Sequence, residues 1–487
     1  MIPLPHLDAA SEEPLYKQLH HFLREAILSG RLARGVRIPP TRELAGQLGL
    51  NRTTVSAAYE LLESEGLIRG HVGRGSFVEG PAPQPSGGLR WEEILPPLAE
   101  NLVPSTEGEL ISFATARPSE QLFPLEEFRA TVAEVLSGRD AVQILQLGSP
   151  HGYGPLRRYL LAGSAMARET DDLVITNGCQ QALDLITRTL IGAGETALIE
   201  DPVYAGLRNV FQRAGVRTVG MPLGLDGLDM DAVERLLARE RPRMLVLTPN
   251  FQNPTGLTMP LAARQSLLKM AQDARVIVVE NDTYGELRYA GDSLPTLKEL
   301  DATGDVIQLR SFSKVAFPGL RVGWVLGPRA ALARIAEAKQ WCDLHSDHLA
   351  QAAVLRFAES GRLEQHRRRM IAAGAERLKT VLSACERYLP AGTRFTRPQG
   401  GMNLWVRLPE PLDASALLER AIRAGVAYLP GRTFAVSRPE PGGLRLSFAG
   451  LTPEKIRTGL SILGEVFEGE RERWSRQNRG ETASAIV

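Results

Sequence analysis

Lys314 lies in a polar turn between two apolar segments, where a charged amine is costly to hold. The preceding residues Val306–Leu309 form a short, mostly apolar run typical of a buried strand. A buried lysine needs a chemical or ionic partner, and its amine can form a Schiff base with an aldehyde. Ser311, Ser313 and, seven residues after the lysine, Arg321 supply donors that suit a phosphate. The alternative is a surface turn with a solvated lysine, so partners elsewhere in the chain decide between the two.

Polar residues also follow other predicted strands. From residue 110 the chain alternates short apolar runs with amphipathic helical stretches, which predicts an α/β domain with a mainly parallel sheet. Ligands of such sheets collect at the carboxyl ends of the strands. The groups at these ends are Asn177-Gly178-Cys179-Gln180 after Leu173–Thr176, Asn253 after Met244–Thr248, and Asp282 after Val276–Glu280. The first group opens a helix whose free backbone N–H groups suit a phosphate.

Length and composition indicate a globular protein of two or three domains. A chain of 487 residues exceeds what one hydrophobic core usually serves. The net charge of +1 indicates neither nucleic acid nor membrane as a partner. The longest apolar runs have only strand length, and no secretory signal is seen. The three cysteines form no Cys-x-x-Cys pair, so we expect a reduced, cytoplasmic chain without a metal or disulfide.

The first eighty residues have the pattern of three helices and a hairpin. Apolar residues recur near a helical period from Leu15 to Leu28, and Gly30 offers a stop. Thr41 and Asn51 are expected to cap two further helices. Residues 67–78 form two strand-like runs around a glycine-rich tip. This order predicts a winged helix-turn-helix.

Several segments of this region resemble the GntR-type DNA-binding module. They are Ile38–Ala45, Arg52–Val55, Glu65–Ile68 and Gly73–Val78, with Tyr59 and Leu62 between them. Pro40 and Thr41 stand where that family more often has serines. The resemblance implies a double-stranded DNA operator as the partner.

The net charge of residues 1–80 does not by itself indicate DNA binding. Residues 1–80 carry nine cationic and nine anionic side chains, so DNA affinity depends on where the cations lie. We assign to the major-groove edge and backbone Arg42, Arg52, Thr53 and Thr54, and to the wing Gly73, Arg74 and Gly75. The alternative is a winged helix used only for protein contacts.

The lysine segment and the strand-end groups together resemble the pyridoxal 5'-phosphate (PLP) site of fold-type I aminotransferases. The resemblance implies that PLP forms an imine with Lys314 and that Asp282 keeps the ring nitrogen protonated. It assigns the phosphate to Gly178, Cys179, Gln180, Ser311, Ser313 and Arg321, the ring face to Tyr204, and the phenolic oxygen to Asn253 and Tyr284. Cys179 stands where the family usually has a serine, threonine or other small residue. Taken singly, an Asn-Pro-x-Gly is more often a bare turn and a strand-end aspartate a cap.

Two further residues complete this resemblance. Tyr153 lies in a segment similar to the family's inter-subunit loop, which implies a homodimer in which the tyrosine reaches the phosphate of the other protomer. Arg445 matches the arginine that grips the α-carboxylate of an amino acid, with a plain edge-strand arginine as the alternative. Candidates for side-chain selectivity, for which a structural role is favoured, are Arg117, Asp343 and His345.

These assignments divide the chain into four parts. We expect the DNA-binding domain at residues 11–80, a Pro/Gly-rich linker at 81–109, the aminotransferase-like domain at 110–467 and a flexible tail at 468–487. A small C-terminal α+β domain is expected from about residue 345 to 467, beside the large parallel-sheet domain.

A GntR-type DNA reader fused to an aminotransferase-like domain is the layout of the MocR group of regulators. The resemblance implies a PLP-dependent transcriptional regulator, a head-to-tail homodimer that senses an amino acid, or PLP itself, through an aldimine at Lys314. The competing interpretation is a working aminotransferase, because the residues for moving an amino group from an amino acid to a 2-oxo acid are all present. The effector, the operator and the sign of regulation stay open.

Overall fold

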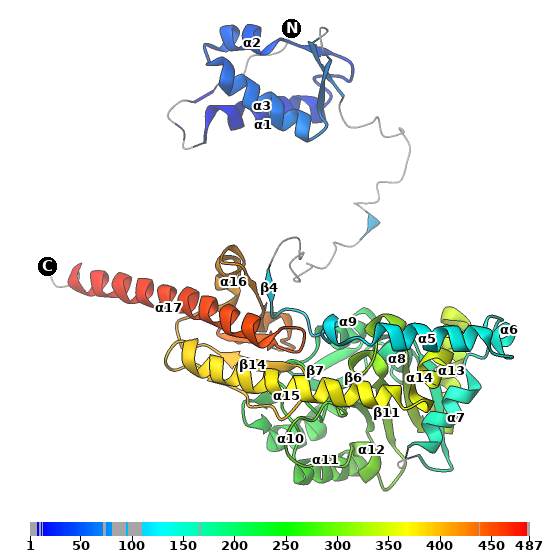
Figure 1. Ribbon diagram of the computed structural model, residues 1–487. Coiled ribbons are helices and arrows are strands. Elements are labelled where there is room, and N and C mark those ends of the chain that lie inside the picture. The colour runs from blue at the N-terminus through cyan, green and yellow to red at the C-terminus, as the bar shows by residue number, and fades with distance from the viewer. Residues whose placement is uncertain are drawn as a thin grey trace. The chain divides into compact units, whose positions relative to one another are not determined.

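The computed structural model describes residues 7–8, 11, 13–71, 75–79, 94–95, 110–164, 167–437 and 439–484. The chain forms two compact units, Met1–Glu100 and Asn101–Val487, each with its own hydrophobic core (Figure 1). Gly73 and Arg74 of the predicted wing lie outside the described residues. So does the predicted linker at 81–109, except for Ile94 and Leu95.

The smaller unit is a winged helix-turn-helix, as predicted. Helices α1 (Leu15–Leu28), α2 (Thr41–Leu48) and α3 (Arg52–Ser64) pack around a shared apolar core. A sheet of order β1-β3-β2 joins β1 (Arg37–Ile38), β2 (Ile68–His71) and β3 (Gly75–Val78). Asn51 caps α3, as expected, by accepting a hydrogen bond from the backbone N–H of Thr53. The cap predicted at Thr41 is wrong, because Pro40 holds that position and its side chain makes no capping bond.

The larger unit is built on an eight-stranded, mainly parallel sheet, which confirms the predicted α/β architecture. Its order is β5-β12-β11-β10-β9-β6-β7-β8, and the strands from β11 to β7 are parallel. The strands are β5 (Asp171–Thr176), β6 (Thr196–Asp201), β7 (Arg217–Gly224), β8 (Gly227–Leu228), β9 (Met244–Leu247), β10 (Ile277–Asn281), β11 (Val306–Ser311) and β12 (Gly323–Pro328). This sheet and its helices are called the large domain.

Helices cover both faces of this sheet because its central strands are apolar on both sides. On one face lie α8 (Gly178–Leu190), α9 (Ala205–Arg213) and α13 (Arg329–Asp343). The other face is covered by α7 (Gly154–Ala162), α10 (Met230–Glu240), α11 (Leu261–Ala274) and α14 (His348–Glu359). Shorter or peripheral helices are α5 (Leu125–Ser137), α6 (Ala141–Ile144) and α12 (Leu297–Leu300).

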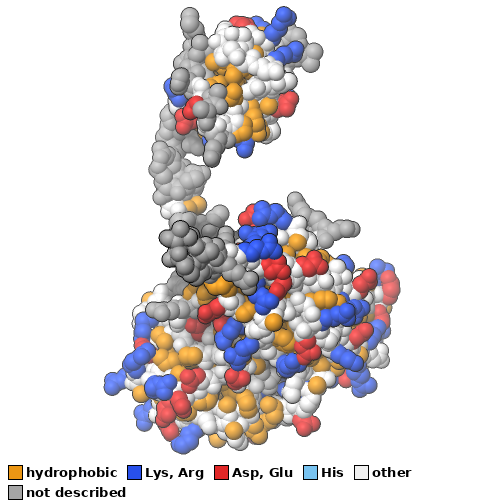
Figure 2. Space-filling view, turned by 90° about the vertical axis from the view of Figure 1, so that its left-hand side faces the viewer, with side chains coloured by type: hydrophobic (Ala, Val, Ile, Leu, Met, Phe, Trp, Pro, Cys, Tyr) orange, Lys and Arg blue, Asp and Glu red, His pale blue; other side chains and the backbone are white. Residues whose placement is uncertain are grey.

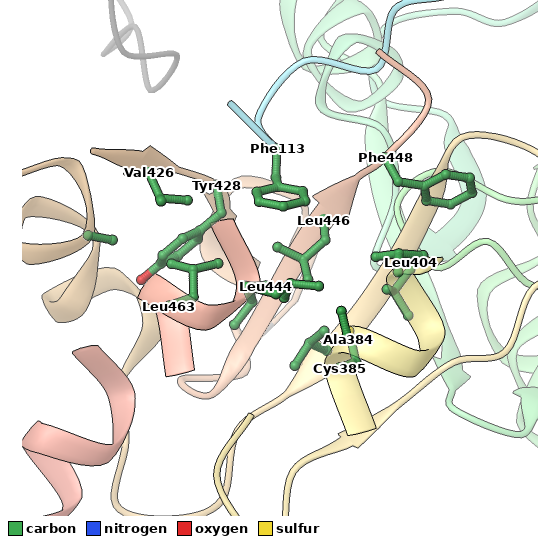
Figure 3. Close-up of a cluster of buried hydrophobic side chains, with 14 of the residues drawn as sticks. Phe113, Ala384, Cys385, Leu404, Val426, Tyr428, Leu444, Leu446, Phe448 and Leu463 are labelled. Atoms are coloured by element: carbon green, nitrogen blue, oxygen red, sulfur yellow. The ribbon is translucent and has the colours of Figure 1, made fainter. Parts of the chain in front are cut away.

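The small domain contains an antiparallel sheet of order β13-β14-β17-β16. Its strands are β13 (Arg394–Phe395), β14 (Asn403–Arg407), β16 (Leu429–Pro430) and β17 (Gly443–Ser447). The packing helices are α15 (Arg362–Tyr388), α16 (Ala414–Arg423) and α17 (Pro453–Ser484). Figure 3 shows Phe113, Tyr428, Leu446 and Leu463 converging in this core.

The small domain does not follow the chain as simply as the sequence suggests. Strand β4 (Ile111–Ser112) pairs in parallel with β15 (Val426–Ala427), so the segment before the large domain belongs to the small one. Helix α14 was expected at the start of the small domain but packs on the large sheet. The chain therefore crosses between the domains after residue 113 and again along α15.

Residues 468–484, expected to form a flexible tail, instead continue helix α17. Ion pairs between residues three or four apart support this polar segment, as between Arg471 and Glu468 and between Arg476 and Glu472. Arg420 of α16 also pairs with Glu470. The sequence pattern lacks an apolar stripe, so only these charged pairs could have indicated the helix.

The surface of the larger unit mixes both signs of charge. On the face seen in Figure 2, Lys and Arg side chains alternate with Asp and Glu, in keeping with the net charge of +1. Among the described residues, no helix is both long enough and apolar enough to cross a bilayer.

Candidate functional site

Lys314 is positioned by the end of β11 and a single 3-10 turn, Phe312–Lys314. Its Nζ donates a hydrogen bond to the carbonyl oxygen of Ala116 at 2.7 Å and lies 5.6 Å from the centroid of the Tyr284 ring. The residues on either side of Lys314 are buried. A solvated surface turn, the alternative interpretation, therefore does not describe this lysine.

The predicted phosphate cradle is assembled at the N-terminus of α8. Arg321 donates through Nη2 to the carbonyl oxygen of Asn177 at 3.1 Å and through Nη1 to Ser313 Oγ at 3.4 Å. Ser311 Oγ in turn donates to Ser313 Oγ at 2.8 Å. Gly178 has a φ of 75°, and a Cβ there would lie 2.5 Å from Arg321 Nη2. Only glycine therefore leaves room for the guanidinium at this helix end.

Tyr284 and Asn253, assigned to the same oxygen by the resemblance, are in contact. Asn253 Nδ2 donates to Tyr284 Oη at 3.4 Å, and both side chains are buried. Tyr204, the predicted ring plate, is 41% exposed. Its ring leans over Gly206, where a Cβ would lie 2.4 Å away, and its exposure leaves room for a stacked ring.

Cys179 faces the same site. Its Sγ lies 3.4 Å from Thr283 Oγ1, and burial raises the pKa of its thiol although Lys314 and Arg321 oppose that rise. Gln180 points elsewhere: its side chain donates to the carbonyl oxygen of Gly206 at 3.1 Å. Thr283 was not singled out from the sequence, although its place between Asp282 and Tyr284 was a usable signal.

Asp282 is nearly inaccessible, with 4% of its surface exposed. Asn250 Nδ2 donates to its Oδ1 at 2.8 Å, and Arg310 Nε lies 3.4 Å from its Oδ2. Neither partner was identified from the sequence, because Asn250 lies in the turn after β9 and Arg310 in the next strand of the sheet. A buried carboxylate with two donors is a suitable partner for a protonated ring nitrogen.

The turns that follow β6 and β9, which carry Tyr204 and Asn253, are hydrogen-bonded to each other. Gln252 Nε2 donates to the carbonyl oxygen of Pro202 at 2.9 Å and to Glu200 Oε2 at 3.3 Å. Glu200 also accepts from the backbone N–H of Thr248 at 3.1 Å. Burial raises the pKa of Glu200 to about 8, although the hydrogen bonds from Gln252 and Thr248 oppose this rise. The sequence pattern did not reveal these residues, because their roles depend on contacts between separate strands.

Arg445 extends from the small domain into the site. Its Nη1 donates to Asn253 Oδ1 at 3.0 Å, Nη2 donates to the carbonyl oxygen of Ala114, and the guanidinium lies 4.9 Å from the centroid of the Phe434 ring. Nε is buried and has no hydrogen-bond partner among the described residues. Burial lowers the pKa of Arg445 to about 10, which Tyr284 and Tyr204 partly oppose. The edge-strand alternative is wrong, because β17 lies between β14 and β16.

Tyr153 is not joined to this group within the described chain. It precedes α7, its backbone N–H donates to Gln351 Oε1 at 2.7 Å, and its ring centroid lies 5.7 Å from that of His348. Burial raises the pKa of the half-buried Tyr153 hydroxyl. The expectation that Tyr153 reaches the phosphate of another protomer stays a prediction.

Asp343 fits the structural role that was favoured for it. Lys339, whose side chain is fully buried, donates to Asp343 Oδ1 at 2.6 Å. The side-chain amides of Asn177 and Gln181 donate to Asp343 Oδ2 at 2.9 and 2.6 Å. The carboxylate therefore fastens the end of α13 to the turn that opens α8.

The predicted DNA contacts lie on two helix starts of the smaller unit. Arg42 is in the first turn of α2, and Arg52, Thr53 and Thr54 form the first turn of α3. The two arginines and Thr53 are exposed. Gly75 opens β3 with a φ of 96°.

The residues gathered around Lys314 fit PLP. The glycine-lined cradle at Gly178 presents N–H, hydroxyl and guanidinium donors for a phosphate, and the unpartnered Nε of Arg445 leaves a buried donor free. Within the described ranges no group of three or more His, Cys, Asp or Glu side chains could hold a metal ion. The donors at the N-terminus of α8 suit an organic phosphate.

Comparison with known proteins gives two family matches. Residues 120–463 match the model described as aminotransferase class I and II, and residues 15–78 match that of bacterial regulatory proteins of the gntR family.

Similar proteins include enzymes and regulators. The chain is 39% identical over 396 residues to 2-aminoadipate transaminase of Thermus thermophilus, and this match covers 78% of this chain and 98% of the relative. It is 29% identical over 482 residues to the probable rhizopine catabolism regulatory protein MocR of Rhizobium meliloti, covering 95% of each. The structure of LysN, an alpha-aminoadipate aminotransferase of Thermus thermophilus complexed with N-(5'-phosphopyridoxyl)-L-leucine, matches with a TM-score of 0.73 and 38% identity over 78% of this chain and 99% of that one.

Proposed function

The chain belongs to the class I and II aminotransferase family and carries a GntR-family DNA-binding domain, the layout of MocR-type regulators, and we propose that it binds operator DNA and uses PLP to sense an amino acid. PLP is the cofactor of its family. The proposal goes beyond family membership in naming the signal and the residues that receive it.

One observation carries the proposal: a connected set of side chains joins the small domain to Lys314. Arg445 donates to Asn253, Asn253 donates to Tyr284, and the Tyr284 ring faces the Lys314 amine. The hydrogen-bond partners of Arg445 are neutral, although the residue is only 4% exposed. A buried cation without a carboxylate favours an anion from outside, and an amino-acid carboxylate fits a planar fork of donors.

The assigned residues would hold PLP from four sides. Gly178, Cys179, Gln180, Ser311, Ser313 and Arg321 would bind the phosphate, Tyr204 the ring face, Asn253 and Tyr284 the phenolic oxygen, and Asp282 the ring nitrogen. Of these, Gln180 would contribute only its backbone N–H, because its side chain is bonded to Gly206. When bound, PLP supplies an aldehyde for reversible bonding to amines and a ring that accepts electrons.

The protein's own groups then act as receptor and switch. Arg445 orients the carboxylate of the incoming amino acid. Once Lys314 is released from the carbonyl of Ala116, its amine can take up a proton from the α-carbon of the bound amino acid. Because Arg445 stands on the small domain and Asn253 on the large one, a bound amino acid strengthens the contact between the domains. We expect the strengthened contact between the large and small domains to change how the two DNA-binding domains of a dimer span their half-sites.

The proposed dimer has a candidate surface on the large domain. Val142, Leu145 and Leu147, on α6 and just after it, are 80%, 65% and 74% exposed. Single exposed apolar residues are ordinary, but three within six positions favour a protein contact. A second copy of the chain is the expected occupant, with the nearby Tyr153 loop reaching the partner's site. The head-to-tail arrangement is part of this proposal.

The competing activity is transamination, which the 39% identity to 2-aminoadipate transaminase favours. The experiment that separates the two is incubation of the PLP-loaded full chain with single amino acids, 2-aminoadipate among them. We expect a change in near-visible absorbance together with a change in operator DNA affinity, and no stoichiometric 2-oxo acid. Sustained 2-oxo acid release without a DNA effect would instead support an enzyme.

One control variant and two further outcomes make this experiment decisive. The Lys314→Ala variant should lose the near-visible absorbance and the DNA response while still binding DNA. A DNA response to PLP alone, unchanged by every amino acid, would make PLP the effector. A colourless parent protein after reconstitution would contradict the assignment of Lys314.

A further inference from the structure

The carboxylate of Asp282 is held from several sides by this chain. Asn250 donates to Oδ1 at 2.8 Å, and the backbone N–H of Asp282 donates to the carbonyl oxygen of Leu309 at 2.9 Å. A Cβ at Gly285 would lie 2.3 Å from Oδ1, so the backbone closes tightly on that oxygen. The second oxygen, Oδ2, faces Arg310, whose Nε lies 3.4 Å away. Each oxygen therefore has its own donor.

Arg310 is itself fixed in place. It lies on β11, the strand that pairs with β10 just before Asp282. Its Nη2 donates to Glu286 Oε1 at 2.6 Å, and its guanidinium carbon lies 5.6 Å from the centroid of the Trp324 ring. Burial alone would lower the pKa of Arg310, but Glu286 and Asp282 raise it. The guanidinium is therefore a permanent positive charge with a set orientation.

One side of this arginine is open. Arg310 and Glu286 line a cavity of about 420 Å³ together with Trp324, Gln308 and Arg367. The side chain of Arg310 is 22% exposed, whereas that of Asp282 is 3% exposed. Water on the open side therefore reduces the cost of burying the Arg310 guanidinium, while its Nε still contacts the buried carboxylate of Asp282.

Two further carboxylates, those of Glu280 and Glu286, act on Arg310 together with Asp282. Glu280 on β10 is fully buried, and burial together with the charge of Asp282 raises its pKa to about 7. Glu286 adds a second carboxylate on the far side of Arg310. Arg264 acts only indirectly: its Nη2 donates to Asn250 Oδ1 at 2.7 Å, which turns the Asn250 amide toward Asp282. Within the described residues, Arg310 is the cation that forms an ion pair with Asp282.

We propose that Arg310 is a positioning residue for the cofactor, which keeps the proton shared by Asp282 and the ring nitrogen on the nitrogen. The proposal rests on the assignment of Asp282 as the partner of that nitrogen. A positive charge 3.4 Å from the carboxylate oxygen disfavours a proton on that oxygen more than one on the more distant ring atom. The same contact fixes the carboxylate plane, because Oδ1 and Oδ2 are then held by different donors.

The test uses the full chain reconstituted with PLP that carries ¹⁵N at the ring nitrogen. Arg310→Gln should move the ring ¹⁵N resonance in magic-angle-spinning NMR toward the unprotonated position. It should also weaken PLP binding roughly tenfold, as expected for losing one charge-assisted contact. Arg310→Lys keeps the charge and should retain most of the parent resonance. Arg334→Gln, which removes an exposed arginine of α13, should change neither.

Two further variants separate the possible failures. The double variant Arg310→Gln/Glu286→Gln removes the pair without leaving Glu286 uncompensated, and should shift the resonance like Arg310→Gln. Asp282→Asn should shift it further. If Asp282→Asn shifts the resonance and neither Arg310→Gln nor the double variant does, the role of Arg310 is overturned and the assignment of Asp282 stands. If Asp282→Asn leaves it unchanged as well, the assignment of Asp282 itself fails.

Discussion

In the proposed function, recognition of an amino acid depends on Arg445. It is buried, stacked on Phe434 and bonded to neutral oxygens, so its charge is stabilised by geometry rather than by an opposite charge. Burying such a charge costs free energy while the site is empty, and binding an anion offsets that cost. The proposed sensing therefore uses a buried cation that forms no ion pair with a carboxylate among the described residues.

Replacing Arg445 by Gln should weaken amino-acid binding roughly 10- to 100-fold, the range expected for a lost charge-assisted contact. PLP affinity should change little, because Arg445 is not among the residues assigned to the cofactor. Spectral titration of the PLP-loaded protein with amino acids measures the first quantity, and PLP titration of the apoprotein the second. Arg445→Lys should bind with intermediate affinity. Equal amino-acid affinity in all three proteins would contradict the role of Arg445.

Glu200 makes stability depend on pH. Its pKa in the folded protein, about 8, lies above its ordinary value of 4.5, so between these values the folded chain holds a proton that the unfolded chain releases. The contribution to stability is complete below about pH 4.5 and is lost as the pH rises to about 8. Glu280, with a pKa raised to about 7 by burial and by Asp282, acts in the same direction.

The Glu200→Gln variant should therefore lose less stability between pH 5 and pH 8 than the parent, by on the order of a few kcal/mol. Glutamine keeps an acceptor for the N–H of Thr248, so the fold is preserved. Urea unfolding at the two pH values measures the difference. An exposed carboxylate such as Glu126, replaced by Gln, is the control and should leave the pH dependence as in the parent. A parallel pH dependence in Glu200→Gln and the parent would refute this explanation.

At the scale of elements, the cradle depends on how closely α8 approaches β12. A Cβ on Gly323 would lie 2.8 Å from the Cα of Gly178, so a glycine in each element lets helix and strand meet. Arg321, between the lysine turn and β12, then reaches the carbonyl of Asn177. Lys314 and Arg321 both lie in the segment 312–322 that joins β11 to β12, so their spacing in the sequence reflects the course of this connection.

Gly178→Ala should lower PLP affinity at least tenfold by displacing Arg321, whose Nη2 would lie 2.5 Å from the new Cβ. The backbone strain alone is matched by Gly194→Ala, since Gly194 has a φ of 83° and no atom within 4 Å of a Cβ. PLP titration and thermal unfolding of both apoproteins separate the effects. Similar PLP affinity in the two variants would mean that Arg321 does not bind the phosphate.

A second element links the domains at the site. The segment Phe434–Ser437 of the small domain is bonded to the end of β6 and the residues after it. The backbone N–H groups of Val436 and Ser437 donate to Asp201 at 2.9 and 3.0 Å, and Val203 N–H donates to the carbonyl oxygen of Phe434 at 2.8 Å. Because Phe434 also stacks on Arg445, the amino acid that we propose to bind at Arg445 would act directly on this connection.

At the scale of the whole molecule, the proposed function assigns DNA binding to the smaller unit and amino-acid binding to the larger one. Each has its own core, so each can keep its fold while the other moves. DNA affinity must come from a few well-placed cations, because residues 1–80 carry equal numbers of both charges. The first turns of α2 and α3 carry the predicted ones.

Arg52→Ala should weaken binding to operator DNA and reduce the slope of log affinity against log salt by about 0.9, the loss of one phosphate contact. Fluorescence anisotropy from low to moderate salt measures that slope. Arg31→Ala removes an equally charged, exposed residue beyond the end of α1 and should change the slope less. An unchanged slope in Arg52→Ala would place the DNA contact elsewhere on the unit.

The sequence by itself determined what depends on neighbours in the chain. The helices and hairpin of the smaller unit, the alternation that builds the parallel sheet, and the polar turns after its strands all arise from local periodicity and turn chemistry. The order of these turns along the chain carries the resemblance that implies PLP and assigns Lys314 and Asp282 to it.

Only the tertiary structure decided what depends on proximity between distant segments. Arg310 and Asn250 meet Asp282 because β9, β10 and β11 are neighbours in the sheet. Arg445 is central because β17 is flanked on both sides, and residue 113 joins a core built mainly from residues after 370. The physical reason is that these contacts are selected by packing and hydrogen bonding across the fold, to which local sequence preferences contribute little.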